Sequence, residues 1–63
     1  MLRTTLKRLR RARKLTQTTL AQRAKVTQAF IAQLETGTER NPTLDTLRRL
    51  AKALKVRVEE LVT

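Results

Sequence analysis

The sequence predicts an all-α fold, a compact arrangement of five short helices formed as a single domain over residues 1–63. Apolar residues recur at helical spacing in several segments, and no segment alternates apolar and polar residues as a strand does. The chain holds one glycine and one proline, so short turns must separate the helices. Without cysteine it has no disulfide, and a chain of 63 residues must rely on tight helix packing, a partner subunit or a ligand.

The first two expected helices cover residues 2–14 and about 17–24. In the first, leucines such as Leu2 and Leu6 lie four residues apart, and most of the remaining positions are basic. Thr16 is a suitable N-cap for the second helix, because its hydroxyl can accept a hydrogen bond from a free backbone N–H of the first turn.

The next two helices are expected over about 28–36 and 44–54, each preceded by a threonine. Thr27 and Thr43 are their N-caps, and Gly37 ends the earlier of the two. As at Thr16, a threonine directly before each helix marks where the preceding turn ends.

The last expected helix, about 58–62, has the weakest start signal. Arg57 stands at its N-cap position, and arginine is a poor capping residue. No repeat, linker or low-complexity segment appears along the chain.

The charge is strongly one-sided. The formal net charge is +10, and residues 1–34 hold nine Lys or Arg and no acid, whereas residues 35–63 hold six basic and five acidic residues. Such a field attracts a polyanion. Phe30 is the one aromatic residue, so a single-strand platform of stacked bases is not expected.

Composition also disfavours catalysis and metal binding. The chain has neither His nor Cys, the commonest acid–base and metal-ligating residues. The five acids show no pairing suited to acid–base work. We therefore expect no enzyme activity, no cofactor and no metal.

Residues 1–15 raise two alternatives, because an amphipathic, Arg-rich segment without acids is also typical of transit peptides and of membrane-surface helices. We prefer the first helix of the fold, since a domain this small needs those apolar positions. No apolar run approaches the ~20 residues that span a bilayer. We expect a cytoplasmic protein with no membrane partner.

The expected helix 28–36 has an unusual outward face. Ile31 and Leu34 point inward, and the opposite face is uncharged, whereas a face built for solubility would carry Lys and Glu. Gln can bond adenine in two places, and Ala can contact a thymine methyl. The predicted base-reading residues are Gln28, Ala29, Ala32 and Gln33.

Three segments together resemble the Cro and phage-repressor family of helix-turn-helix regulators, also called xenobiotic-response-element-type proteins. They are LRRARKLTQTTLA (9–21), VTQAFIAQLETG (26–37) and RNPTLDTLRRLAKALKV (40–56). The resemblance implies a lambda-repressor-like DNA-binding domain whose helix-turn-helix unit covers about 17–36. It also implies a transcriptional regulator, of bacterial or phage type, that binds double-stranded DNA in the major groove and is nucleoid-associated when bound.

The resemblance assigns further roles by position. Arg10 and Glu35 match a structural ion pair, and Gln17 would bond a phosphate at the start of the second helix, where free amides favour an anion. The predicted contacts to the DNA backbone are Arg10, Thr16, Gln17, Thr18, Thr27, Thr36, Arg40 and Asn41.

We expect a homodimer that binds a palindromic operator as a repressor. The candidate dimer patch is Val58, Leu61 and Val62, because a five-residue helix cannot turn all three inward. The alternative is an antitoxin or controller-type subunit whose main role is to bind a partner protein, with DNA binding autoregulatory.

The chain departs from relatives at the helix ends. Lys14, Lys25 and Lys55 stand where relatives often have glycine, at a steric cost of roughly 1–2 kcal/mol each if the sites are left-handed. Thr19 replaces the usual acidic partner of a capping box, and none of these changes lies on the predicted reading face.

Overall fold

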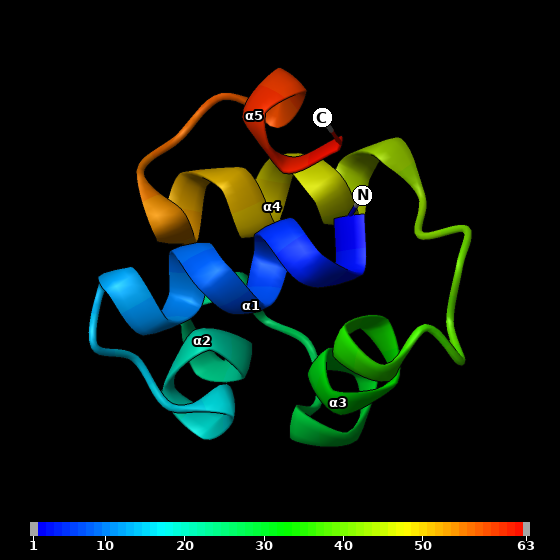
Figure 1. Ribbon diagram of the computed structural model, residues 1–63, viewed down its shortest axis with the longest axis horizontal. Coiled ribbons are helices and arrows are strands. Elements are labelled where there is room, and N and C mark those ends of the chain that lie inside the picture. The colour runs from blue at the N-terminus through cyan, green and yellow to red at the C-terminus, as the bar shows by residue number, and fades with distance from the viewer. Residues whose placement is uncertain (1, 63) are drawn as a thin grey trace.

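The computed structural model describes residues 2–62 and confirms the all-α fold (Figure 1). The helices are α1 (Leu2–Ala12), α2 (Gln17–Ala24), α3 (Gln28–Thr36), α4 (Leu44–Leu54) and α5 (Val58–Val62). Within the described residues there is no strand, and no helix is long and apolar enough to cross a membrane.

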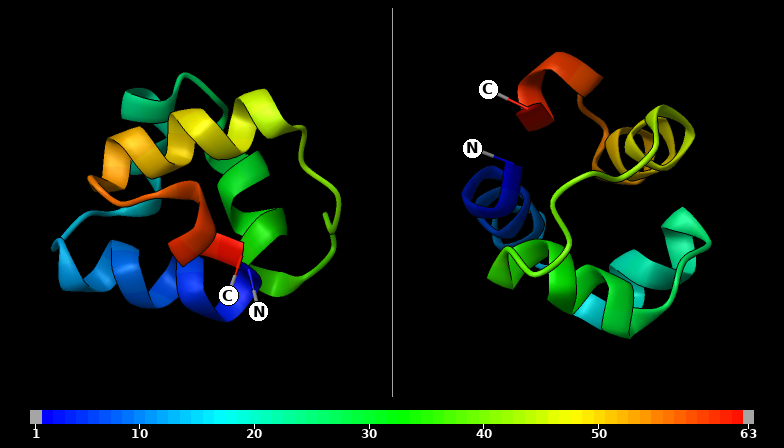
Figure 2. Two further views of the ribbon diagram at one scale, coloured as in Figure 1. Left: turned by 90° about the horizontal axis from the view of Figure 1, so that it is seen from above. Right: turned by 90° about the vertical axis from the view of Figure 1, so that its right-hand side faces the viewer.

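The helices pack so that α2 and α3 share one end of the molecule. α3 contacts α1 and α2, α4 contacts α2, and α5 packs on α1 and α4. In Figure 1 and in the right view of Figure 2, α2 and α3 lie on the opposite side of α1 from α5. The start of α1 and the end of α5 lie side by side in all three views.

One hydrophobic core joins all five helices. Its fully buried large side chains are Leu6, Leu20, Ile31, Leu34, Leu50, Leu54 and Leu61. Each helix contributes at least one of them, so the helix positions are mutually dependent. Phe30 is half-buried and packs against the core as an additional contact.

Two sequence-based expectations need correction. Leu61 was expected in a dimer patch, but it is fully buried and closes the core, because it is the inward position of α5. Val58 is half-buried against the core, which leaves Val62, 51% exposed, as the free member of that trio. Leu44 shares the helical spacing of the leucines that follow it, which predicts an inward side chain, yet it is 53% exposed in the first turn of α4.

Three helices end in the same lysine motif. Lys14, Lys25 and Lys55 have φ angles of 57°, 59° and 59°, in the left-handed region. The backbone N–H of the residue after each lysine donates to the carbonyl of the residue five positions earlier, as in the 2.9 Å bond from Val26 N to Ala21 O. This bond is typical of the Schellman motif. The following apolar side chain then packs against the core.

The three threonines predicted as N-caps do cap their helices. Thr16, Thr27 and Thr43 each accept a hydrogen bond from the backbone N–H three residues on. At the start of α5, where Arg57 offers no capping oxygen, a side chain of the helix bonds the backbone: the Arg57 N–H donates to the Glu60 carboxylate at 2.8 Å. This is the half of a capping box that the third helical residue provides, and it explains a helix that starts after an arginine.

The left-handed lysines predict a gain of stability on substitution by glycine. Lys55→Gly removes a steric cost of roughly 1–2 kcal/mol, and part of that gain is offset by the greater freedom of glycine in the unfolded chain, about 0.4–1 kcal/mol. We expect a net stabilisation of roughly 0.5 kcal/mol, measured by thermal and urea melts followed by circular dichroism.

The matched control is Lys52→Gly, which makes the same substitution inside α4. It is expected to destabilise by about 0.7–1 kcal/mol, because glycine weakens a helix interior. Equal losses at both positions would contradict the left-handed assignment of Lys55.

Candidate nucleic-acid interface

Two short helices, α2 and α3, are held at a fixed angle by the turn between them. The turn begins with left-handed Lys25, whose N–H bonds back to α2, and ends with Thr27, which caps α3. Arg49 of α4 donates from Nη1 to the Lys25 carbonyl at 3.3 Å. The end of α2 is therefore tied to α4 as well as to α3.

The outward face of α3 is polar but uncharged. Ile31 and Leu34 are buried, at 0% and 1% exposure, and this fixes the rotation of the helix. The predicted base-reading residues lie on the other side: Gln28, Ala29 and Gln33 are exposed and Ala32 is half-buried. Their role in reading bases stays a prediction.

The structure brings Arg10 and Glu35 together across α1 and α3. Arg10 Nε lies 2.7 Å from Glu35 Oε2, and Arg10 Nη2 lies 3.1 Å from Oε1. Arg10 Nη1 also donates to the Leu15 carbonyl at 2.8 Å. The side chains are 11% and 3% exposed, so this bidentate pair is largely shielded from water.

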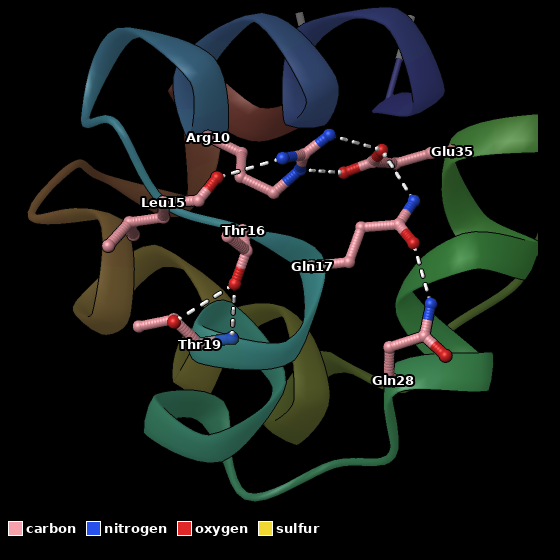
Figure 3. Close-up of polar contacts among 7 residues, drawn as sticks. All are labelled: Arg10, Leu15, Thr16, Gln17, Thr19, Gln28 and Glu35. Atoms are coloured by element: carbon pink, nitrogen blue, oxygen red, sulfur yellow. Dashed lines mark hydrogen bonds and ion pairs between the residues drawn. The ribbon is translucent and has the colours of Figure 1, made fainter.

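The same carboxylate begins a chain of hydrogen bonds that reaches the start of α3 (Figure 3). Gln17 Nε2 donates to Glu35 Oε1 at 3.1 Å, and Gln28 Nε2 donates to Gln17 Oε1 at 2.7 Å. An ionised carboxylate only accepts, so Gln17 must donate to it, and its oxygen is then free to accept from Gln28. The direction of both amides follows from the charge of Glu35.

The environment of Glu35 favours its ionised form. Burial alone would raise the pKa of this carboxyl. The hydrogen bonds from Arg10 and Gln17, with the positive charges of Arg10 and Lys7, outweigh that effect and hold the pKa below its ordinary value. The pair is therefore a charged link between helices at neutral pH.

These contacts involve two of the predicted backbone residues, Arg10 and Gln17. Arg10 was expected to contact a phosphate as well as Glu35, but its guanidinium is buried and donates from all three nitrogens inside the protein. This corrects the phosphate assignment for Arg10. Gln17 is half-buried and shares its amide between Glu35 and Gln28, which leaves one Nε2 hydrogen, so its contact with a phosphate stays a prediction.

The other predicted backbone residues lie around the outward face of α3. Thr16, Thr18 and Thr27 are exposed at the starts of α2 and α3, and Thr36 is exposed at the end of α3. In the loop before α4, Arg40 and Asn41 are exposed too. Arg40 Nε donates to the Gly37 carbonyl at 3.3 Å, which holds its stem near the end of α3.

Sequence reasoning missed the link between Gln17 and Gln28. One signal was available, because each glutamine is the first residue of its helix and directly follows a capping threonine. The angle between α2 and α3 brings the first residues of these two helices together, and that angle cannot be predicted from a local sequence pattern.

The chain matches a family model and a curated relative. A family model described as helix-turn-helix matches residues 6–61. The chain is also 48% identical over 56 residues to y4dJ of Sinorhizobium fredii, which is described as an uncharacterized HTH-type transcriptional regulator. That match covers 89% of this chain and 71% of the relative.

The lowered pKa of Glu35 predicts a loss of stability in acid. Because its folded-state pKa lies below the ordinary value of 4.5, folding favours the ionised carboxylate. The stabilisation is present in full above pH 4.5 and is lost as the pH falls through the folded-state pKa. Urea melts between pH 6 and pH 3 measure it.

Two variants make this experiment specific. Glu35→Gln should cost about 1–3 kcal/mol at pH 6 and progressively less as the pH falls through the folded-state pKa of Glu35, because it replaces charged hydrogen bonds with neutral ones. Glu39→Gln, in the loop after α3, should keep the wild-type dependence on pH. A Glu35→Gln protein with an unchanged acid slope would show that Glu35 does not carry the effect.

Proposed function

The chain belongs to the helix-turn-helix family of the Cro and phage-repressor type, a family of DNA-binding transcription regulators, and we propose that it reads a specific DNA sequence. In this proposal α3 enters the major groove of double-stranded DNA. Residues 1–63 act as one helix-turn-helix domain, with Gln28, Ala29 and Gln33 against the base edges and Ala32 close behind them.

The outward face of α3 carries this proposal. It is exposed and uncharged, although it belongs to a chain of net charge +10. Glutamine side chains can bond two atoms of one adenine, and small neighbours let the helix sink into a groove about 12 Å wide. In such an arrangement the uncharged face can contact the base edges inside the groove, while the surrounding cations bind the phosphates on either side of it.

The rim of this face suits the DNA backbone. Thr18 and Thr27 offer hydroxyls beside the free N–H groups at the starts of α2 and α3, where the helix dipoles favour an anion. Thr16 lies beside them, and its hydroxyl would have to turn from Thr19 to donate to a phosphate. Thr36, Arg40 and Asn41 lie at the other end of α3. Such contacts would set the register of the protein on DNA and leave base choice to α3.

We further propose a homodimer on a palindromic operator, acting as a repressor by covering a promoter. One module of this kind buries about 600–1,000 Å², a small interface for tight binding. Two copies one helical turn apart, about 34–36 Å, would combine their binding energies. Exposed Val62 remains a candidate dimer contact.

Selection from a random duplex library tests the reading face. We expect the wild-type protein to return a palindromic sequence logo, and Gln33→Ala to lose preference at one base pair per half-site. Its affinity for the selected site should fall by about 1–3 kcal/mol, because a bidentate contact is removed.

The matched control is Gln22→Ala. Gln22 is also exposed, but it lies on α2 and outside the predicted reading face. This variant should return the wild-type logo. An unchanged logo for Gln33→Ala would mean that α3 does not read bases through this residue.

Arg40 tests the backbone contacts separately. Arg40→Ala should weaken binding to every duplex alike and reduce the slope of log K against log salt by about 1, because one phosphate contact is lost. Arg57→Ala removes an exposed arginine from the start of α5 and should change the slope far less. If both variants change the slope equally, Arg40 makes no direct phosphate contact.

A further inference from the structure

A second basic surface lies beside α3, on the outer side of α1. Arg3, Lys7 and Arg11 follow one another at intervals of four residues, and Arg8 lies next to them. All four are exposed. With Thr36 they line a shallow groove between α1 and the end of α3, which we call the α1 groove.

The cations of the α1 groove form no close ion pair among the described residues, although the charge of Lys7 acts on Glu35 at longer range. The one acid of the groove, Glu35, is taken by Arg10, and within residues 2–62 none of the four cations forms an ion pair. Like charges four residues apart on a helix repel each other. A surface built for solubility alone mixes both signs, so this arrangement indicates an external anion.

The α1 groove continues the predicted DNA surface. It ends at Thr36, the last residue of α3, and the Arg3 guanidinium lies so close to Gly37 that a Cβ there would meet its Nη1 at 2.7 Å. The left view of Figure 2 shows the start of α1 beside the end of α3. A duplex held against α3 would extend toward these cations.

We propose that the α1 groove binds phosphates of the DNA that flanks the base pairs read by α3, which extends the footprint of each domain. This inference rests on the proposed function of α3. Guanidinium groups bind phosphate oxygens in pairs, and an ammonium group binds them as a point charge. The contact adds affinity and positions the protein without adding base preference.

The packing of α1 argues against an anionic lipid surface as the occupant. Membrane-surface helices insert an apolar face below the headgroups. In α1 that face is already used, because Leu6 is fully buried and Leu2 and Leu9 pack against the core. The free part of the helix is a polar, cationic strip that suits phosphates arranged along a duplex.

The test is a triple variant with a charge-matched control. Lys7→Gln, Arg8→Gln and Arg11→Gln together remove three charges from the α1 groove, and Arg3 is kept because it packs over Gly37. The control carries Lys52→Gln, Lys55→Gln and Arg57→Gln, three exposed cations at the end of α4 and the start of α5. Circular dichroism melts verify that both variants fold.

Binding is measured against salt on two duplexes: the selected site within long flanks, and the same site trimmed to the base pairs that α3 reads. On the long duplex, the α1 groove variant should lose about 2–3 from the slope of log K against log salt, and roughly 10–100-fold in affinity at physiological salt. The control should lose less than 1 from the slope. On the trimmed duplex the two variants should behave alike, and the selected logo should not change.

Several results would overturn the inference. Equal slope losses in the two variants on the long duplex would indicate a general field and no local contact. A loss of the same size on the trimmed duplex would place the contact within the read base pairs. Binding of the wild type to phosphatidylserine vesicles that the α1 groove variant loses, with an unchanged DNA slope, would identify a lipid surface. A wild-type protein that binds no duplex overturns the proposed function itself, and this inference with it.

Discussion

The buried Glu35 carboxylate constrains the relative positions of three helices. A charged group shielded from water must be compensated by opposite charge and hydrogen bonds. Arg10 of α1 and Gln17 of α2 supply them to this residue of α3, at distances of 2.7–3.1 Å. If α1, α2 or α3 moved relative to the others, the Glu35 carboxylate would lose hydrogen bonds from Arg10 or Gln17 while still shielded from water. The interaction therefore keeps the outward face of α3 in one orientation.

The basic composition serves the fold as well as the exposed surface. Two arginines donate to carbonyls at the C-terminal ends of helices, Arg49 to Lys25 and Arg40 to Gly37, and Arg10 donates to the Leu15 carbonyl in the turn between α1 and α2. Cations are favourable at helix C-termini, where carbonyls lack partners and the dipole is negative. Part of the net charge is thus used internally. Among residues 2–62, by contrast, no carbonyl or acid forms a hydrogen bond or ion pair with the cations of the α1 groove.

Local signals predicted most of the fold. Capping threonines gave the starts of α2, α3 and α4, and the spacing of Ile31 and Leu34 gave the inward side of α3. Features that depend on distant packing were missed. Leu61 is buried because α5 folds back over α1 and α4, and the Gln17–Gln28 contact depends on the angle between two helices. The packing of α5 and the angle between α2 and α3 cannot be predicted from residue type or from spacing along the chain.

The three left-handed lysines have a consequence for the lifetime of the protein in a cell. Each holds strain that glycine would relieve, in a chain of 63 residues with one small core. A ligand that binds only the folded state shifts folding toward that state by mass action. On the proposed function, copies bound to DNA are protected, whereas unbound copies open more often and meet proteases sooner. The abundance of the regulator then follows the occupancy of its own sites.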